Sequence, residues 1–214
     1  MRQIKIVPQY MWVPLLLTVS CNALAYYGTR LVTANMVHYN LSNRLDDQIP
    51  LIPWTVVIYF GCYVLWVVNY ILGCRQERKT AFRFISADFL AKIICMICFV
   101  IFPTTNVRPI ISGNTIWDVG MRLLYRMDAA DNLFPSIHCL TSWFCYIAVR
   151  ENDKIPLWYR RFSAFAAVLV FISTLTTKQH VLIDVVAGVA LAEGCYYFVK
   201  KSKFALKYES WMPL

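Results

Sequence analysis

The stretch PWTVVIYFGCYVLWVVNYIL, residues 53–72, runs for 20 positions without a charged side chain. A helix of about 20 apolar residues is long enough to cross the hydrocarbon core of a bilayer. Because backbone N–H and C=O groups find no water there, a membrane segment must be a helix or a strand of a closed barrel. The run lacks the apolar–polar alternation of a barrel strand, so it predicts a transmembrane helix.

Five further apolar runs predict an all-α fold, a polytopic membrane helical bundle with about six transmembrane helices. The six runs are Tyr10–Tyr27, Pro53–Leu72, Phe84–Phe102, Pro135–Val149, Phe162–Thr176 and Val181–Val199. The fourth and fifth runs are short for a bilayer, so we expect them to lie among the other helices or to continue into flanking residues. Pro8 and Pro14 interrupt the first run, which favours a membrane span over a cleaved signal peptide.

The composition supports a single membrane unit. Apolar residues make up 59% of the 214 positions and charged residues 15%, whereas a soluble domain has about 25% charged residues. These values exclude a disordered chain, a disulfide-stapled miniprotein and a typical soluble enzyme. Six spans use roughly 120 residues. We therefore predict one integral membrane domain over residues 1–214, with no second soluble domain.

The distribution of Lys and Arg predicts the orientation in the membrane. The net charge is +9, and 14 of the 21 cations fall in the two terminal segments and in the loops after the second and fourth runs. By the positive-inside rule, both termini face the cytoplasm of a multi-pass cell-membrane protein. No Lys/Arg-rich arm with interleaved aromatic residues indicates a nucleic-acid partner. The expected partners are the bilayer and a membrane lipid, and the sequence specifies no oligomeric state.

Three polar motifs lie at the ends of runs on the predicted outer side. They are Arg108-Pro109, Pro135-Ser136-Ile137-His138, and His180 with Asp184. Polar groups in or at the edge of a membrane are costly and therefore indicate function. His180 and Asp184 are four residues apart, so on a helix they share a face where the carboxylate can orient the imidazole. Ser136 opens a run beside the unpaired N–H groups of a helix N-terminus, which favour anions.

Each motif alone also fits a structural role: a snorkelling arginine, a capped helix or a buried His–Asp pair. Together, their order and common side resemble the type-2 phosphatidic acid phosphatase superfamily. Its signature has three parts: Lys, six residues and Arg-Pro; Pro-Ser-x-His; and Ser-Arg, five residues, His, three residues and Asp. Arg108-Pro109 matches the end of the first part and residues 135–138 match the second. Ser173, His180 and Asp184 match the third.

The resemblance implies a role for each matched residue, over a motif-bearing core of about residues 92–188. His180 is the expected nucleophile, which forms a phosphohistidine, and Asp184 orients it. His138 is the expected general acid and base. The resemblance also implies that the reaction uses no cofactor and no metal ion. The expected phosphate-binding residues are Arg108, Lys178, Ser136 and Ser173.

Two phosphate-binding cations of the family signature are missing from their usual positions. The signature Lys falls on Ile101 and the signature Arg falls on Thr174. Lys178 is a candidate substitute for one of them, because it lies two residues before the third-motif histidine. Arg122 and Arg126, in the outer loop, are candidate substitutes for the other.

The outer loop also resembles one subgroup of the superfamily, which includes relatives of inositolphosphotransferases. The resemblance rests on Asp128 and Asn132, which precede Phe-Pro-Ser, and on the tetrapeptide Thr-Lys-Gln-His at residues 177–180. Asp128 and Asn132 are therefore candidate supporting residues of the site.

The resemblance implies a phosphatase that hydrolyses a lipid phosphate, of the phosphatidic acid or isoprenyl phosphate or diphosphate type, at the outer membrane face. The same residues would serve a lipid phosphotransferase that moves a phospho-head group to an alcohol. A transporter is disfavoured, because the charges lie at one face rather than at mid-membrane. We interpret Asp88 and Lys92 as an intramembrane pair, and Glu193 and Gly194 as part of helix packing. An inactive structural relative is the remaining alternative, because two signature cations are absent.

Overall fold

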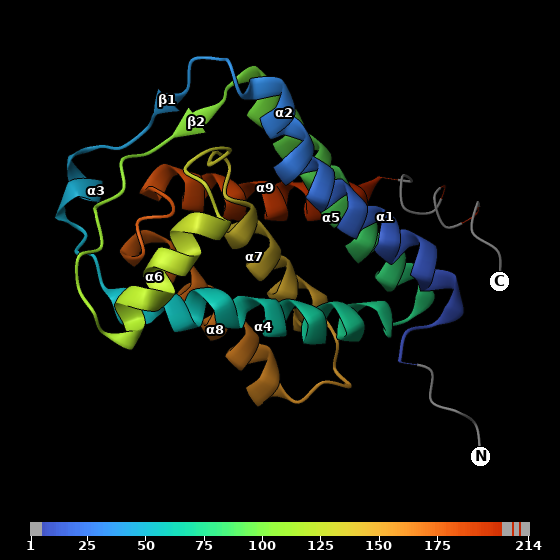
Figure 1. Ribbon diagram of the computed structural model, residues 1–214. Coiled ribbons are helices and arrows are strands. Elements are labelled where there is room, and N and C mark those ends of the chain that lie inside the picture. The colour runs from blue at the N-terminus through green and yellow to red at the C-terminus, as the bar shows by residue number, and fades with distance from the viewer. Residues whose placement is uncertain (1–5, 203–206, 208–209, 211–214) are drawn as a thin grey trace.

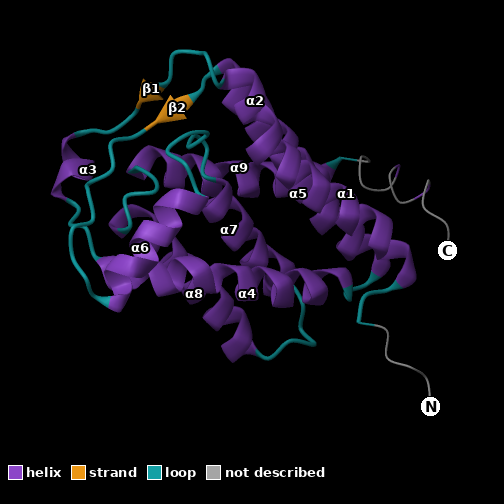
Figure 2. Cartoon of the chain, in the orientation of Figure 1, coloured by secondary structure: helices purple, strands orange, loops and turns teal. Residues whose placement is uncertain are grey.

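The computed structural model describes residues 6–202, 207 and 210 and is mostly helical (Figure 1). The longer helices are α1 (Trp12–Ala23), α4 (Val56–Cys74), α5 (Arg78–Ile101), α6 (Ile116–Met127), α7 (Ile137–Arg150), α8 (Leu157–Thr176) and α9 (Leu182–Lys201). The shorter elements are α2 (Thr29–Thr33), α3 (Arg44–Gln48), a π-helical turn (Leu24–Gly28), 3-10 turns at Gln9–Met11 and Pro53–Thr55, and strands β1 (Tyr39–Asn40) and β2 (Thr104–Thr105). The prediction of a helical fold is confirmed, with this one pair of strands as the exception (Figure 2).

Within the described residues, three helices are long and apolar enough to cross a membrane. They are Pro53–Cys74, Arg78–Ile101 and Leu182–Lys201. The first contains the second predicted run, and the other two cover the third and sixth runs except for Phe102 and Val181. The first run is interrupted by the π-helical turn that follows α1, and α7 has only 14 residues. The count of six spans and the cytoplasmic position of both termini stay predictions.

Helices α5 and α7 organise the core. α5 packs against α1, α4 and α9, and α7 packs against α4, α8 and α9. Ten of the 14 residues of α7 are buried, so this short helix lies among the others. α8 instead continues into flanking residues and reaches 20 residues. The phenylalanine rings of Phe84 and Phe144 are fully buried and meet edge to face, with centroids 6.2 Å apart.

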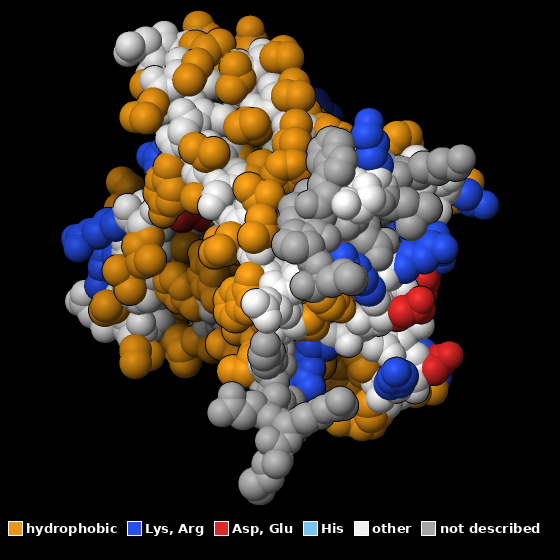
Figure 3. Space-filling model, turned by 90° about the vertical axis from the view of Figure 1, so that its right-hand side faces the viewer, with side chains coloured by type: hydrophobic (Ala, Val, Ile, Leu, Met, Phe, Trp, Pro, Cys, Tyr) orange, Lys and Arg blue, Asp and Glu red, His pale blue; other side chains and the backbone are white. Residues whose placement is uncertain are grey.

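The basic turns gather at one end of the bundle. The α4–α5 turn, the α7–α8 turn and the end of α9 lie toward the right and bottom of Figure 1, away from α3, α6 and the two strands. Arg150 pairs there with Glu193, and Lys200 lies 2.8 Å from Glu151. Figure 3 looks onto this right-hand side and shows basic and acidic side chains on its right-hand part, further basic side chains at its left edge, and hydrophobic side chains over much of the area between them. Glu193 therefore belongs to an ion pair, consistent with a structural role.

The predicted outer loops hold more structure than the sequence analysis assigned. Helices α3 and α6 both form in segments that we expected to be irregular, and each begins with a capping box. Asn43 pairs with Asp46 at the start of α3, and Thr115 pairs with Asp118 at the start of α6. A capping residue followed three positions later by an acidic side chain is a recognisable helix start. The sequence therefore contained a signal for both helices.

The close approach of α7 and α9 depends on Gly188. A Cβ at this position would lie 2.6 Å from the carbonyl oxygen of Ser136 and 3.3 Å from the amide nitrogen of Leu140. Gly194, which the sequence analysis placed in helix packing, has nothing within 4 Å of its Cβ position. The expected packing role of Gly194 is therefore wrong, because no described residue packs against its Cβ position. Gly188 takes that role.

We expect Gly188→Ala to destabilise the protein by about 1–3 kcal/mol, the usual cost of an overpacked contact. The added methyl must push α9 away from the first turn of α7. Gly194→Ala is the matched control on the same helix, where alanine is a better helix former than glycine. The thermal unfolding midpoint in detergent should fall only for Gly188→Ala. Equal midpoints for the two variants would contradict the packing argument.

Candidate active site

A cavity of about 270 Å³ is lined by α1, α4, α6 and α7 and by the turn that precedes α9. Its lining includes both predicted catalytic histidines, His138 and His180, together with Asp128. The two imidazole rings lie with their centroids 6.0 Å apart. This separation is short enough for one bound group to contact both rings. The cavity is therefore the candidate active site.

The imidazole of His180 is oriented by a buried carboxylate. Its Nδ1 lies 3.3 Å from Oδ2 of Asp184, which is fully buried. The same oxygen accepts the amide N–H of Val181 at 3.1 Å. His180 precedes α9 by two residues, so the pair does not share a helix face as predicted; the carboxylate reaches back from the first turn of α9 instead. With Nδ1–H donated to the carboxylate, Nε2 keeps a free lone pair.

A left-handed residue at the end of α8 turns the chain toward the cavity. Lys178 has φ +56°. The amide of Gln179 donates to the carbonyl of Thr174 at 2.9 Å, and the amide of Lys178 donates to that of Leu175 at 3.1 Å. These two bonds form a Schellman motif, which ends a helix abruptly. The amide of His180 also donates to the Thr174 carbonyl, at 3.1 Å, so the motif fixes the backbone of the candidate nucleophile.

Helix α3 holds this turn from outside. The ammonium of Lys178 donates to the carbonyls of Asp46 and Ile49, at 3.0 and 2.5 Å. The carboxylate of Asp46 accepts the amide N–H of Leu182 at 2.7 Å, which places a negative charge at the N-terminus of α9. The structure thus directs Lys178 to backbone oxygens of the α3 segment and not into the cavity. The sequence analysis missed Asp46, whose only sequence signal was the capping box.

The imidazole of His138 is held by a tyrosine and a carboxylate. Its Nδ1 lies 3.2 Å from the hydroxyl oxygen of Tyr59, and that hydroxyl donates to Asp128. Because Tyr59 gives its only proton to Asp128, its oxygen must accept the Nδ1–H of His138. This tautomer leaves Nε2 unprotonated. Nε2 is buried and finds no partner among the described residues.

Asp128 is the anchor of this second network. Tyr26, on the π-helical turn after α1, donates its hydroxyl to the other carboxylate oxygen. Burial favours the neutral acid, but the neighbouring His138 and the two tyrosine hydroxyls outweigh it, so the pKa of Asp128 lies below its ordinary value. Asp128 is therefore ionised at neutral pH and accepts from both tyrosines. Sequence reasoning missed Tyr26 and Tyr59, because nothing distinguishes them from the other tyrosines of apolar runs.

Arg108 lies beside the cavity and is absent from its lining. Its guanidinium donates to the carbonyls of Asp128 and Ala129 and to Oε1 of Gln179. It also lies over the ring of Tyr125, 5.0 Å from the centroid. Gln179, which does line the cavity, is 1% exposed. The side-chain amide of Gln179 therefore lies between the Arg108 guanidinium and the cavity.

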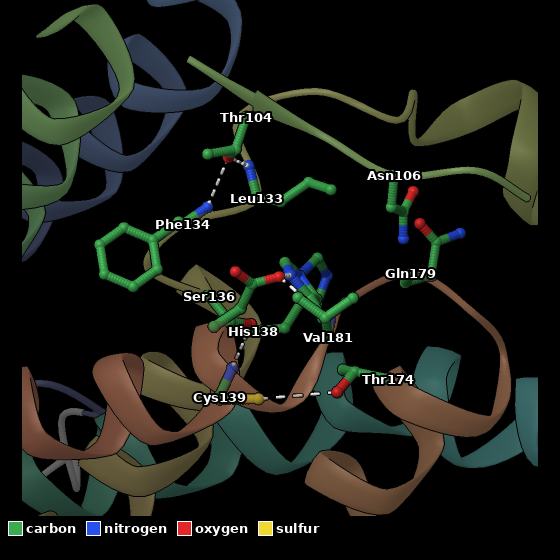
Figure 4. Close-up of polar contacts among 12 residues, drawn as sticks. Thr104, Asn106, Leu133, Phe134, Ser136, His138, Cys139, Thr174, Gln179 and Val181 are labelled. Atoms are coloured by element: carbon green, nitrogen blue, oxygen red, sulfur yellow. Dashed lines mark hydrogen bonds and ion pairs between the residues drawn. The ribbon is translucent and has the colours of Figure 1, made fainter. Parts of the chain in front are cut away.

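The two predicted serine ligands are engaged inside the fold. The amide N–H of Ser136 donates to the carbonyl of Asp184 at 3.1 Å, and its hydroxyl oxygen accepts the amide of Cys139 at 3.2 Å (Figure 4). Ser173 donates its hydroxyl to the carbonyl of Val170 at 2.8 Å. The Ser136 amide expected to bind phosphate is thus occupied, because α7 begins against α9. Ser136 caps α7 and Ser173 bonds back onto α8.

The supporting residues separate into two groups. Arg122 donates to the carbonyl of Gly113 at 2.6 Å, and Arg126 is exposed. Asn132 lines the cavity and donates to the hydroxyl of Thr29 at 2.9 Å. Across the described residues, no Lys or Arg lines this cavity and no three His, Cys, Asp or Glu side chains form a possible metal site. The two missing signature cations are therefore not replaced in its walls.

Strand β2 positions the segment that leads into α7. The hydroxyl oxygen of Thr104 accepts the amides of Leu133 and Phe134, at 3.0 and 2.9 Å (Figure 4). Thr105 donates to the carbonyl of Ala130 at 2.6 Å. Two adjacent threonines thereby hold the loop that carries the Phe-Pro-Ser sequence. Sequence reasoning missed both, since they gave no motif of their own.

Comparison with known families agrees with the motif pattern. The family model described as the PAP2 superfamily matches residues 29–198, which is most of the chain. The matched range contains Arg108, both cavity histidines and Asp184. A search of curated proteins gives no significant match.

We expect Asp46→Ala to lower the unfolding free energy by about 1 kcal/mol, since it removes the acceptor for the first amide of α9. The exposed neighbour Asp47 supplies the matched control, Asp47→Ala. Asp46→Asn keeps an oxygen acceptor and should retain most of the stability. The thermal midpoint in detergent is the measurement. If Asp46→Ala and Asp47→Ala unfold at the same temperature, α3 does not hold the turn as described.

Proposed function

The chain belongs to the PAP2 superfamily, and from that premise we propose that it is an integral membrane phosphatase acting on a lipid phosphate at the outer membrane face. PAP2 proteins are generally phosphatases. The observation that carries the proposal is the pair of histidines in one cavity. In each, Nδ1 is held by a carboxylate, directly by Asp184 or through Tyr59 by Asp128. Each imidazole is thereby oriented with Nε2 free for chemistry.

The proposed reaction has two steps and uses no metal ion. Nε2 of His180 attacks phosphorus, and the bond from phosphorus to the lipid oxygen breaks. The substrate enters as its phosphate monoanion, whose proton passes to Nε2 of His138, and His138 then gives that proton to the leaving alkoxide. In the second step, the now neutral Nε2 of His138 takes a proton from water, which attacks the phosphohistidine and releases inorganic phosphate and neutral His180. Asp184 stabilises the positive charge on the His180 ring during both steps.

The surroundings of the cavity suit a phosphate attached to an apolar molecule. Trp66 and Tyr63 line it beside His138, with the Trp66 ring centroid 5.4 Å from that of His138. In such a poorly solvated site, each charge interaction is stronger than in water. Arg108, held behind Gln179, supplies the fixed positive charge that favours the phosphoryl group. A lipid places its phosphate at headgroup level and its tail in the bilayer, which matches a site at the end of apolar helices.

A lipid phosphotransferase is the second candidate, and a specific observation favours it. Oδ1 of Asp131 and Oδ1 of Asn132 are buried acceptors without a partner, and both residues line the cavity. Unpaired acceptors attract hydroxyl donors and repel phosphate oxygens. An alcohol, such as a polyol, could bind there and replace water in the second step. The phospho group would then pass from His180 to that alcohol.

We expect His180→Ala and His138→Ala each to reduce phosphate release from phosphatidic acid or isoprenyl phosphate at least about 1,000-fold, since each removes an essential partner of the reaction. His38→Ala, which changes the third histidine, half-buried and outside the lining of this cavity, should leave the rate unchanged. The assay measures inorganic phosphate in detergent with EDTA, which should not inhibit. Label transfer only when an alcohol is added would favour the transferase. If neither phosphate release nor label transfer occurs under any of these conditions, both candidates are contradicted.

Tyr59→Phe should lower kcat by about 10–100-fold, the usual effect of losing a group that orients a reacting histidine. The variant removes the oxygen that accepts Nδ1–H of His138, so the tautomer is no longer fixed. Tyr197→Phe is the control, because Tyr197 is 65% exposed on α9 and does not line the cavity. Steady-state kinetics and their pH dependence test the effect. Similar rates for the two variants would argue against the proposed relay.

A further inference from the structure

A second cavity adjoins the candidate active site. It has a volume of about 500 Å³ and is lined by α1, α4 and single residues of α5 and α7. The two cavities share four lining residues, which are Val19, Asn22, Tyr63 and Trp66. The two cavities therefore adjoin across these side chains, and we call them together the slot. It runs from the two histidines into the space between α1 and α4.

The far part of the slot is apolar and opens at the outer surface of the helices. Ile6, Trp12 and Val67 line it and are 65%, 49% and 62% exposed. Such an opening among apolar side chains suits a hydrocarbon chain that enters sideways from a bilayer. A water-soluble phosphate ester has no apolar chain, so contact with this apolar lining would not strengthen its binding.

Three polar groups interrupt the apolar lining. Oγ1 of Thr141 is buried without a partner, and the residue is only 4% exposed. Oδ1 of Asn22 is also buried and unpartnered. Lys92, 3% exposed, donates to Asp88 at 2.9 Å, and its ammonium carries two further protons. Buried polar atoms are usually paired, so unpaired ones in a cavity indicate a ligand that completes them.

The position of Thr141 relates these groups to the reacting phosphate. Thr141 follows His138 by three residues on α7, so it lies about 4.5 Å further along the helix axis. A phosphate at the histidines would place the next few lipid atoms beside Thr141. In a glycerol or sphingoid lipid, those atoms carry ester, amide or hydroxyl groups. In an isoprenyl phosphate, they are hydrocarbon only.

We propose that the slot selects lipid phosphates with a hydrogen-bonding backbone, of the glycerol or sphingoid type, over isoprenyl phosphates. The inference rests on the proposed function for its account of where the phosphate lies. An ester or amide oxygen accepts from the Thr141 hydroxyl or the Lys92 ammonium, and a lipid hydroxyl or amide N–H donates to Asn22. An isoprenyl chain leaves all three groups unsatisfied in an apolar wall. Leaving them unsatisfied disfavours that substrate.

The test compares kcat/KM for phosphatidic acid, ceramide 1-phosphate and a chain-matched isoprenyl phosphate in the same mixed micelles. We expect the wild type to prefer at least one backbone-bearing substrate over the isoprenyl phosphate by about tenfold or more. Thr141→Val should remove most of this preference, because it lowers the rate on the backbone-bearing substrate and relieves the unsatisfied hydroxyl that disfavours the isoprenyl phosphate, whereas Thr141→Ser should keep the preference. The ratio between phosphatidic acid and ceramide 1-phosphate distinguishes the two backbones. An isoprenyl preference, or an equal fall on all three substrates in Thr141→Val, would overturn the proposal.

A binding measurement separates this proposal from the proposed function. His180→Ala is titrated with a dibrominated diacylglycerol and, separately, a brominated isoprenoid alcohol, and tryptophan fluorescence is recorded. We expect the diacylglycerol to quench the tryptophan fluorescence at a lower concentration than the isoprenoid alcohol does. The total quenching by the diacylglycerol should be smaller when Trp66→Phe is added, and its binding should be weaker when Thr141→Val is added. If the diacylglycerol binds more tightly but the wild type hydrolyses no lipid phosphate, the phosphatase proposal is contradicted and the proposed selectivity of the slot stands. If the wild type hydrolyses lipid phosphates but both probes quench equally, only the proposed selectivity of the slot is contradicted.

Discussion

The buried carboxylate of Asp184 is the contact on which the rest of the site depends. Its side chain holds the imidazole of His180 and the amide of Val181, the N-cap residue of α9, and its backbone carbonyl accepts the amide of Ser136. One residue thus joins the starts of α7 and α9. Gly188, one turn further along α9, lets the two backbones approach closely enough for this joint. The two histidines face one cavity because His138 lies in the first turn of α7 and His180 lies just before α9, and these two helix starts are joined.

The buried carboxylate of Asp88, elsewhere in the apolar core, is matched with partners. Asp88 accepts from Thr18, Tyr70 and Lys92, at 2.6, 2.8 and 2.9 Å, which confirms the expected Asp88–Lys92 pair. Such matching is required because an unpaired charge in an apolar interior is costly. Of the eleven residues with an unpartnered buried side-chain atom among those described, six line the cavity or the slot. The exceptions to the rule therefore gather where a ligand would bind.

The electrostatics of the cavity differ from those of a basic phosphate site. No cation lines it among the described residues, and Asp128 and Asp131 do. Positive charge must then come from the two imidazoles when protonated and from Arg108 behind Gln179. A site of this kind binds a phosphate weakly by charge alone. On the proposed function, the site would rely on the apolar slot to bring the phosphate to the histidines, and on the transition state for its strongest interactions.

The sequence by itself determined the helical class, the runs that became α4, α5 and α9, and the three motifs that meet at one end of the bundle. Those features follow from local rules, because apolar length and short spacings act within one segment. Only the tertiary structure decided which polar atoms are free. It assigned Lys178 to α3, the Ser136 amide to Asp184, and Tyr59 to His138. Each of these bonds joins residues more than 40 positions apart, so no local pattern could specify it; packing of the helices did.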